Sequence, residues 1–260
     1  MNALKDMEYS GRGVSVGMTT GGQRFMAYTL TGRSPSSQAR ELVQGKETGV
    51  IRTSVTDPEQ LARGSPALLI YPAMVPVNDG LVVASNGAQT KLLYSVAKRG
   101  GLSPEAIVAR AFQFPSWEYD QKDDRWIDLT TYEPDSNATP RISAVLHRTR
   151  DPVLDIVYKN DKGKQDSNLT LVHEFSPGQA FMITTYSGGN ESPLLLPFGD
   201  QEPLEMSVAG ETVDELAAEF YAAIAGGSKP GDNFRVSAAV MLMRNNGIDT
   251  AIINRSTRGD

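Results

Sequence analysis

The sequence predicts an α+β fold in which antiparallel sheets are covered by helices. Segments with strand character follow one another in groups joined by turn signals, and they do not alternate with helices as in a parallel sheet. Helix-start signals occur at few places, each between groups of strands. With 260 residues, the chain can bury a large core without a metal or disulfide staple. We find no repeat and no linker, so we expect one domain over residues 1–260 with loose tails at 1–8 and 256–260.

The first group of predicted strands opens with a hairpin. Val14–Gly17 and Arg24–Leu30 flank Thr19-Thr20-Gly21-Gly22, whose glycines are typical of a tight turn. Three further segments are rich in Val, Ile and Leu and bounded by Gly, Pro or Asn, and we predict strands there: Gly49–Ser54, Ala67–Tyr71 and Leu81–Ala84.

Two helices are expected next. The first covers Thr90–Arg99. The second begins at Ser103-Pro104-Glu105, because Ser caps a helix, Pro suits its first position and Glu favours its positive end; we expect it to run to about Phe114. The polar segment Asp120–Thr139 that follows is predicted to be irregular.

A second group of strands follows, with turn signals at Asn160–Gly163 and Pro177-Gly178. The last three of its members are expected to form an antiparallel meander, and the Gly- and Pro-rich segment Ser187–Pro203 is expected to be a loop. The predicted strands are Arg141–Arg148, Val153–Tyr158, Leu169–Phe175 and Gln179–Tyr186.

The C-terminal part predicts one helix and one hairpin. Thr212-Val213-Asp214-Glu215 is a capping box, and the apolar residues after it recur at helical spacing as far as Gly226-Gly227. Val236–Met243 and Ile248–Ile253 are predicted strands around Asn246-Gly247, the preferred pair of a type I′ turn.

Composition excludes several classes of protein. Without cysteine there is no disulfide scaffold, no thiolate metal site and no thiol nucleophile, and two histidines 26 residues apart do not have the spacing of a metal site. The net charge of −6 argues against nonspecific nucleic-acid binding. No apolar run approaches the roughly 20 residues that span a bilayer, and residues 1–9 lack the apolar core of a signal peptide. We therefore expect a cytoplasmic protein that binds neither nucleic acid nor membrane.

The average charge hides a basic segment. Between Tyr9 and Arg40 the chain has four arginines and no acidic residue, which leaves −10 on the rest of the chain. An arginine-bearing segment in an acidic protein is a candidate anion site, and a basic surface stripe without a ligand is the alternative.

Several short segments, taken in order, resemble the archaeal-type inosine monophosphate (IMP) cyclohydrolase family. The resemblance spans about residues 9–198, and the stretch before Glu133 looks longer than in that family. The matching pieces are Tyr9-Ser10-Gly11-Arg12, Ala27-Tyr28, Gly32–Arg40, Tyr71, Ser85-Asn86-Gly87, Tyr132-Glu133, Thr139-Pro140-Arg141-Ile142, Thr184–Gly188 and Pro197-Phe198.

The resemblance implies a fold and a reaction. The fold is the four-layer αββα sandwich of the N-terminal nucleophile hydrolase type, which usually carries a Cys, Ser or Thr nucleophile at a processed N-terminus. This chain has no cysteine and starts with Met-Asn-Ala, so we expect that fold without its usual chemistry. The reaction is the closure of formylaminoimidazole carboxamide ribotide to IMP, without cofactor or metal.

A ribonucleotide monophosphate needs donors for its phosphate. Arg33, Ser34 and Arg40 lie in a turn-rich segment that offers guanidinium and backbone N–H groups, and Arg12 and Arg141 can add charge from other strands. The alternative for Arg12 and Arg141 is a structural role, in which each pairs with a buried carboxylate.

Ring closure needs a proton removed from the attacking amide nitrogen and a proton delivered to the departing oxygen. The resemblance implies Tyr71 and Glu133 for these roles, against the alternatives of a buried strand tyrosine and a solvated loop glutamate. Asn86, followed by Gly87, is expected either to read the purine or ribose or to form a simple turn.

Two other functions stay open from the sequence. One is a non-catalytic purine-nucleotide-binding protein on the same scaffold, which the longer stretch before Glu133 allows if it displaces that side chain. The other is an amide hydrolase of the N-terminal nucleophile type, which needs a processed N-terminus. In each case we expect a homo-oligomer.

Overall fold

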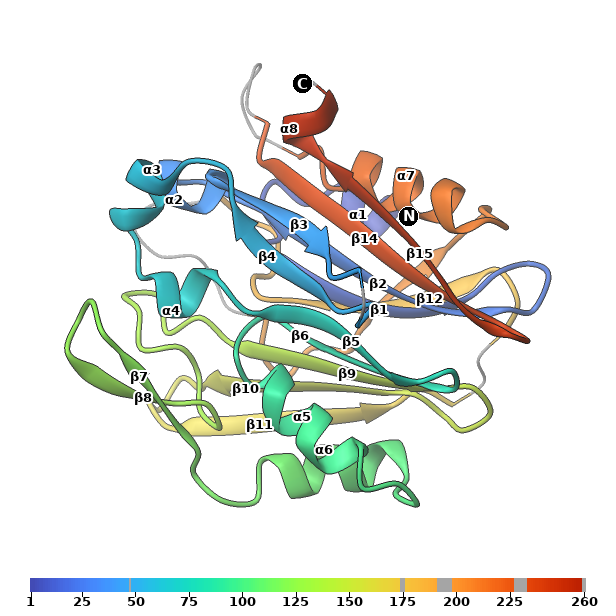
Figure 1. Ribbon diagram of the computed structural model, residues 1–260, viewed down its shortest axis with the longest axis horizontal. Coiled ribbons are helices and arrows are strands. Elements are labelled where there is room, and N and C mark those ends of the chain that lie inside the picture. The colour runs from blue at the N-terminus through green and yellow to red at the C-terminus, as the bar shows by residue number, and fades with distance from the viewer. Residues whose placement is uncertain (47, 174–175, 191–197, 227–232, 259–260) are drawn as a thin grey trace.

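The fold is built on two antiparallel sheets, with a few short helices around them (Figure 1). The computed structural model describes residues 1–46, 48–173, 176–190, 198–226 and 233–258. The six-stranded sheet has the order β13 (Leu204–Ser207), β12 (Gln179–Thr184), β1 (Arg12–Met18), β2 (Arg24–Thr31), β14 (Arg235–Arg244) and β15 (Gly247–Asn254). The seven-stranded sheet has the order β11 (Gln165–Leu171), β10 (Val153–Lys159), β9 (Arg141–His147), β6 (Leu81–Ser85), β5 (Pro72–Asn78), β4 (Ile51–Val55) and β3 (Arg40–Gln44).

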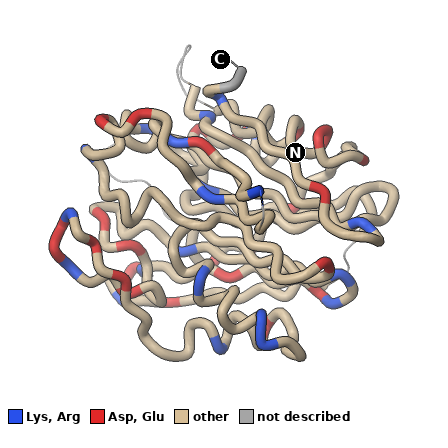
Figure 2. The backbone as a smooth tube through the Cα atoms, in the orientation of Figure 1, with Lys and Arg blue, Asp and Glu red and all other residues tan. Residues whose placement is uncertain are grey.

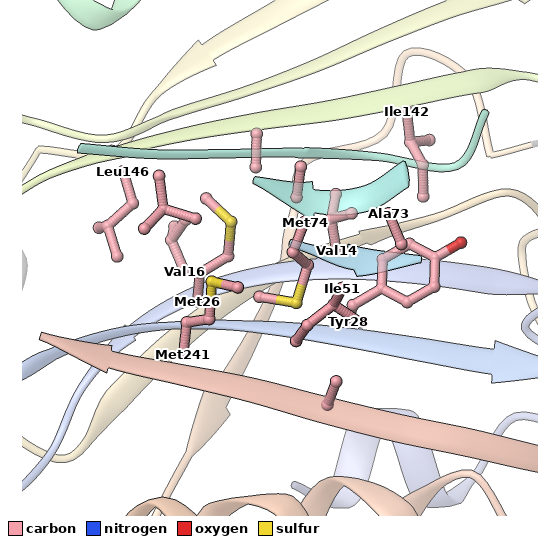
Figure 3. Close-up of a cluster of buried hydrophobic side chains, with 14 of the residues drawn as sticks. Val14, Val16, Met26, Tyr28, Ile51, Ala73, Met74, Ile142, Leu146 and Met241 are labelled. Atoms are coloured by element: carbon pink, nitrogen blue, oxygen red, sulfur yellow. The ribbon is translucent and has the colours of Figure 1, made fainter. Parts of the chain in front are cut away.

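The main hydrophobic core lies between the two sheets. Val14 and Met26 of the six-stranded sheet pack in one cluster with Met74 and Ile142 of the seven-stranded sheet (Figure 3). Charged residues lie mostly in loops and at strand ends (Figure 2). The facing sheets therefore form an apolar interior, and polar groups that enter it do so at the strand ends.

Short helices cover the outer faces of both sheets. Against the six-stranded sheet pack α7 (Val213–Ala223) and α1 (Asn2–Lys5), and against the seven-stranded sheet pack α5 (Thr90–Ala97) and α6 (Pro104–Ala111). Because both faces are covered, the central strands are buried along almost their whole length, which is why β1 and β14 are nearly uninterrupted apolar and small residues. The other helices are α2 (Pro35–Gln38), α3 (Pro58–Ala62), α4 (Pro66–Leu69) and α8 (Arg255–Arg258).

Helix starts follow the predicted capping signals. The Thr212 hydroxyl accepts from the backbone N–H of Glu215, whose carboxylate accepts from the Thr212 backbone, so the capping box of α7 is confirmed. Ser103 caps α6, which ends at Ala111, three residues earlier than predicted. The predicted antiparallel sheets are confirmed as well.

Four predictions about elements are wrong. Residues 67–71 hold the end of α4 instead of a strand, because Pro66 at the first helical position favours a turn of helix. The predicted irregular segment contains most of a hairpin, β7 (Trp117–Asp120) and β8 (Arg125–Asp128). The meander breaks at β12, which crosses to the six-stranded sheet and pairs with β1. The β14–β15 turn consists of Asn245 and Asn246, and neither has the positive φ that a type I′ turn requires.

The ends of the chain also differ from a simple pair of loose tails. Residues 2–5 form α1, in which Leu4 is buried, and the Met1 amino group donates to the Ser207 carbonyl at 2.9 Å. At the other end, α8 follows β15 directly. Of the expected loop 187–203 the structure describes residues 187–190 and 198–203, and residues 191–197 lie outside it.

One side chain ties the two sheets together beside β3. The Asn254 amide, at the end of β15, accepts from the Leu42 backbone N–H at 3.0 Å and donates to the Leu42 carbonyl at 2.9 Å. A side-chain amide thus makes the pair of hydrogen bonds that a neighbouring strand would make. These bonds fix β3, and with it Arg40 at the start of that strand.

A buried carboxyl on β10 makes stability depend on pH. Asp155 is 4 % exposed, its Oδ2 has no hydrogen-bond partner among the described residues, and burial raises its pKa to about 7. The folded state then holds the proton more tightly than the unfolded chain, where an Asp titrates near 3.9. Stability is therefore expected to fall by about 1.4 kcal/mol per unit between about pH 4 and pH 7, and to level off above that range.

Replacing Asp155 with Asn is expected to abolish most of this decline. Urea unfolding at several pH values measures it, with Asp161→Asn, in the exposed turn after β10, as the matched control. If the unfolding free energies of the wild type and of Asp155→Asn change by the same amount between pH 4 and pH 7, the assignment to Asp155 is wrong.

Candidate functional site

A cavity of about 260 Å³ lies where strand ends of both sheets meet. The starts of β1, β3 and β9 and the ends of β2 and β12 border it, together with the segment from α2 to α4. The segments around β1, β2 and β3 bring three of the four arginines of the basic segment, Arg12, Arg33 and Arg40, to one place, whereas Arg24 does not line the cavity. The lining residues are Tyr9, Gly11, Arg12, Thr31, Arg33, Ser34, Ser36, Ser37, Arg40, Gly64, Ser65, Leu68, Leu69, Glu133, Asp135, Asn137, Thr139 and Tyr186.

Arg12 and Glu133 form a buried ion pair in the cavity wall. Arg12 Nη1 donates to Glu133 Oε1 at 2.9 Å and Nη2 donates to Oε2 at 3.0 Å, and the two residues are 8 % and 2 % exposed. Burial raises the pKa of Glu133, against the opposing effect of Arg12. Burial alone would lower the pKa of Arg12, but Glu133, together with Tyr71 and Tyr28, outweighs burial and raises that pKa well above its usual value. The structural pairing that the sequence left open for Arg12 is therefore present, and it lies at the candidate site.

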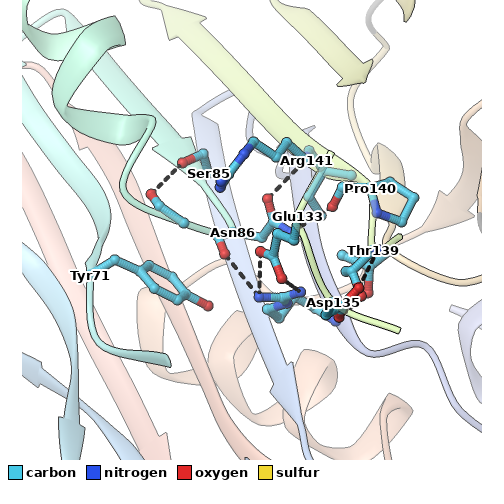
Figure 4. Close-up of polar contacts among 12 residues, drawn as sticks. Tyr71, Ser85, Asn86, Glu133, Asp135, Thr139, Pro140 and Arg141 are labelled. Carbon is cyan, nitrogen blue, oxygen red and sulfur yellow. Dashed lines mark hydrogen bonds and ion pairs between the residues drawn. The ribbon is translucent and has the colours of Figure 1, made fainter. Parts of the chain in front are cut away.

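Asn86, Gly87 and Arg141 lie behind this pair and do not line the cavity. The Asn86 carbonyl accepts from Arg12 Nη1 at 3.1 Å, and the Asn86 amide donates to the Pro140 carbonyl at 2.8 Å (Figure 4). Arg141 is 2 % exposed and donates to the Gln89 side chain at 2.9 Å and to the Thr131 carbonyl at 2.7 Å. The structure therefore brings these predicted substrate-binding residues to the site as a supporting layer.

Gly87 has no room for a side chain. A Cβ there would lie 2.5 Å from the Gln89 side-chain oxygen and 2.8 Å from Arg141 Nη1. Packing around the buried guanidinium therefore accounts for glycine at this position.

Tyr71 is also set back from the cavity. It is 2 % exposed (Figure 4). Its hydroxyl lies 2.9 Å from that of Tyr28, which is fully buried. Burial raises the pKa of Tyr28 well above its usual value. The predicted acid and base are thus in the same region, but of the two only Glu133 lines the cavity.

Arg33, Ser34 and Arg40, which the sequence proposes for the phosphate, line the cavity together. The Ser34 hydroxyl caps α2 and the Arg33 guanidinium lies over the Tyr9 ring, 5.6 Å from its centre. Arg40 is 4 % exposed; its Nε donates to the Ser37 carbonyl at 3.0 Å, and its Nη1 has no hydrogen-bond partner among the described residues. A buried guanidinium N–H without an acceptor is costly, and Arg40 lines the cavity, so an anion that reaches this N–H would stabilise it.

A third polar group in the wall was missed from the sequence. Thr139 Oγ1 donates to Asp135 Oδ2 at 2.5 Å and lies 2.6 Å from the Tyr186 hydroxyl, and all three residues line the cavity. Thr139 and Tyr186 belong to the short pieces that carry the family resemblance, which was the one signal for them. Asp135 carried no signal, because a loop carboxylate gives no clue to its neighbours.

The rest of the described chain offers little for a metal. Among the described residues, no three His, Asp or Glu side chains come close enough together to hold an ion. His147 Nδ1 accepts from the backbone N–H groups of Thr149 and Arg150, and burial, with Arg150, lowers the pKa of His147.

None of the described helices combines the length and apolar composition needed to cross a bilayer.

Comparison with known proteins identifies a family. A family model described as IMP cyclohydrolase-like protein matches residues 9–247, a range that includes every residue lining the cavity. A comparison with curated proteins finds no match.

Proposed function

Because the chain belongs to the IMP cyclohydrolase-like protein family, we propose that it closes formylaminoimidazole carboxamide ribotide to IMP with loss of water. One observation within the molecule supports this most: a single cavity is lined both by a buried carboxylate, Glu133, and by a buried guanidinium with an unfilled hydrogen-bonding position, Arg40. The substrate needs both, one for proton transfer and one for its phosphate.

We assign proton removal to Glu133. In ring closure the carboxamide nitrogen forms a bond to the formyl carbon and loses one proton. The formamide nitrogen loses its proton as it forms the C=N bond of the ring, and the formyl oxygen takes up two protons and leaves as water. A carboxylate has about four lone-pair positions, and Arg12 uses two on Glu133, so positions are left for a substrate N–H. Arg12 holds the carboxylate in place, and its charge favours negative charge developing on the formyl oxygen.

The phosphate is assigned to Arg33, Ser34 and Arg40. All three line the cavity at the α2 end, and Ser36 and Ser37 add hydroxyls beside them. Asn86, Gly87 and Arg141 are proposed to hold the Arg12–Glu133 pair in position, since none of them lines the cavity.

Tyr71 is proposed as the proton donor to the departing oxygen, through one intervening water because its hydroxyl is set back from the cavity. It lies close enough to Arg12 to interact electrostatically, and its hydroxyl is held by Tyr28. Replacing Tyr71 with Phe is expected to lower kcat about 100-fold, while the Kd for IMP changes less than about 3-fold. The variant Tyr28→Phe removes the partner but keeps the Tyr71 hydroxyl, and it should lose less. A Tyr71→Phe variant as active as the wild type would remove Tyr71 from the mechanism.

The test of the function is direct. Purified protein is mixed with formylaminoimidazole carboxamide ribotide, and the formation of IMP is followed by ultraviolet absorbance. Turnover would support the enzyme. Tight binding of IMP without turnover would favour the second candidate, a non-catalytic nucleotide-binding protein. The occupation of both Glu133 oxygens by Arg12 is the observation that favours this candidate.

Fold type, location and assembly complete the proposal. Two facing sheets with helices on their outer sides support the αββα sandwich of the N-terminal nucleophile hydrolase type. Mass spectrometry of the intact chain tests the alternative function of an amide hydrolase of this fold type, which needs a processed N-terminus.

A role in purine synthesis suggests a location in the cytoplasm. Light scattering tests the expected homo-oligomer.

A further inference from the structure

The proposed ring closure does not use the polar group formed by Asp135, Thr139 and Tyr186 in the cavity wall. Its three residues come from two parts of the sequence, the loop before β9 and the segment after β12. It lines the same cavity as Arg33 and Arg40, whose side chains have hydrogen-bond donors and no acceptors. The question is what this group presents to a ligand.

The loop from Glu133 to Thr139 is closed on itself. The Glu133 backbone N–H donates to the Thr139 carbonyl at 2.8 Å, and the Thr139 backbone N–H donates to Asp135 Oδ1 at 2.8 Å. Ala138 takes a φ of +47°, which is rare for a residue with a side chain. These bonds set the two carboxylates, Glu133 and Asp135, on one short loop that borders the cavity.

The Tyr186 ring is fixed from its other side. It stacks on Tyr9 with 5.7 Å between ring centres, and Tyr9 packs edge-on against Phe234 at 5.4 Å. The backbone N–H of Tyr9 donates to the Gly188 carbonyl at 3.0 Å, which joins the two segments. The hydroxyl of Tyr186 is thereby held at Thr139.

The hydrogen bonds of this polar group can run in only one direction. The Asp135 carboxylate has no proton to give, so Thr139 Oγ1 donates to it. Thr139 has then used its proton, and it must accept from the Tyr186 hydroxyl. Tyr186 in turn has used its own proton, so its oxygen offers only lone pairs to anything else. Burial raises the pKa of Tyr186, which keeps the phenol protonated at neutral pH.

We propose that Asp135 and Tyr186, oriented by Thr139, form an acceptor site for the ribose hydroxyls of the nucleotide. The ribose is bonded to the phosphate, and Arg33 and Arg40 line the same cavity, so a ligand held by its phosphate brings its hydroxyl donors to this wall. An acceptor-only wall favours a ribose over a sugar that lacks these hydroxyls, because the lost donor leaves the Tyr186 oxygen, which is buried, unpaired. This inference rests on the proposed binding of a purine ribonucleotide.

Binding of two nucleotides tests it. The Kd values of IMP and of its 2′,3′-dideoxy analogue are measured by calorimetry for the wild type, Thr139→Val and Tyr186→Phe. We expect the wild type to prefer IMP by about 10-fold or more, and each variant to prefer it by less than about 3-fold, with dideoxy binding little changed. Tyr94→Phe, on α5 outside the cavity, is the matched control and should keep the wild-type ratio.

The outcomes separate this inference from the function. A wild type that binds both nucleotides equally, or variants that keep the wild-type ratio, would overturn the acceptor site alone. Failure of the wild type to bind either nucleotide would overturn the proposed function and this site with it. A variant that only loosens the fold weakens both ligands together and leaves the ratio unchanged, which also counts against the site.

Discussion

Replacing Glu133 with Gln is expected to lower kcat by about 10²- to 10⁴-fold, the usual range for loss of a general base. The amide keeps the shape of the side chain and one acceptor toward Arg12, but it cannot take up the proton of the attacking nitrogen. The same change removes the counter-charge of a buried guanidinium, and breaking a buried ion pair costs about 3–5 kcal/mol. We therefore expect a lower Tm as well as slower turnover.

Activity and stability have to be separated in this variant. Single-turnover rates are measured at a temperature where circular dichroism shows the variant folded, and Glu205→Gln, at an exposed position on β13, serves as the control. IMP binding should change far less than kcat, since the phosphate is assigned to other residues. A folded Glu133→Gln with wild-type turnover would show that the carboxylate is structural, like the pairing it makes with Arg12.

Replacing Arg40 with Gln is expected to raise the Kd for IMP by about 10- to 150-fold, which corresponds to the 1.5–3 kcal/mol typical of a hydrogen bond to a charged group. The reason is the unfilled Nη1 position on a guanidinium that is 4 % exposed. Inosine, which lacks the phosphate, should bind equally well to wild type and variant. Arg52→Gln, on the neighbouring strand β4 with an exposed side chain, removes the same charge outside the cavity and is the matched control.

Two results would contradict the role of Arg40. Equal weakening of IMP and inosine would point to a change in the cavity as a whole. An unchanged Kd for IMP would move the phosphate to Arg33, whose guanidinium lies over Tyr9. Either result leaves the Glu133 experiment interpretable, because the two side chains come from different segments of the chain.

The sequence predicts well what depends on local patterns. The apolar β1 and β2, the capping box at Thr212 and the basic segment that includes Arg40 each depend on residues within a few positions of one another. It predicts poorly what depends on distant partners. β12 pairs with β1, which has a free edge, and not with β11, which precedes it in the sequence. A turn signal in the sequence does not show which strand the next one will pair with.

The same division holds for the site. The resemblance pointed to Arg12 and Glu133, but not to their bidentate contact, since they are 121 positions apart. Asn86 was a candidate ligand-binding residue because it follows a predicted strand, and Arg141 because its charge can reach a phosphate from another strand. In the structure both side chains are buried behind the Arg12–Glu133 pair, and the Asn86 carbonyl accepts a hydrogen bond from Arg12. Asp135 was missed because only its hydrogen bond to Thr139, which in turn contacts Tyr186, makes it part of the site.

The amide of Asn254 has a consequence for how copies of this chain can associate. By occupying both backbone groups of Leu42, it fills the middle of one margin of the seven-stranded sheet with a side chain of the same molecule. Another chain cannot add a strand at that point without displacing it. The opposite margin is β11, whose ladder among the described residues is with β10 only. If this sheet grows by strand addition between protomers, it can therefore grow in one direction only, which yields closed pairs and not open-ended fibres.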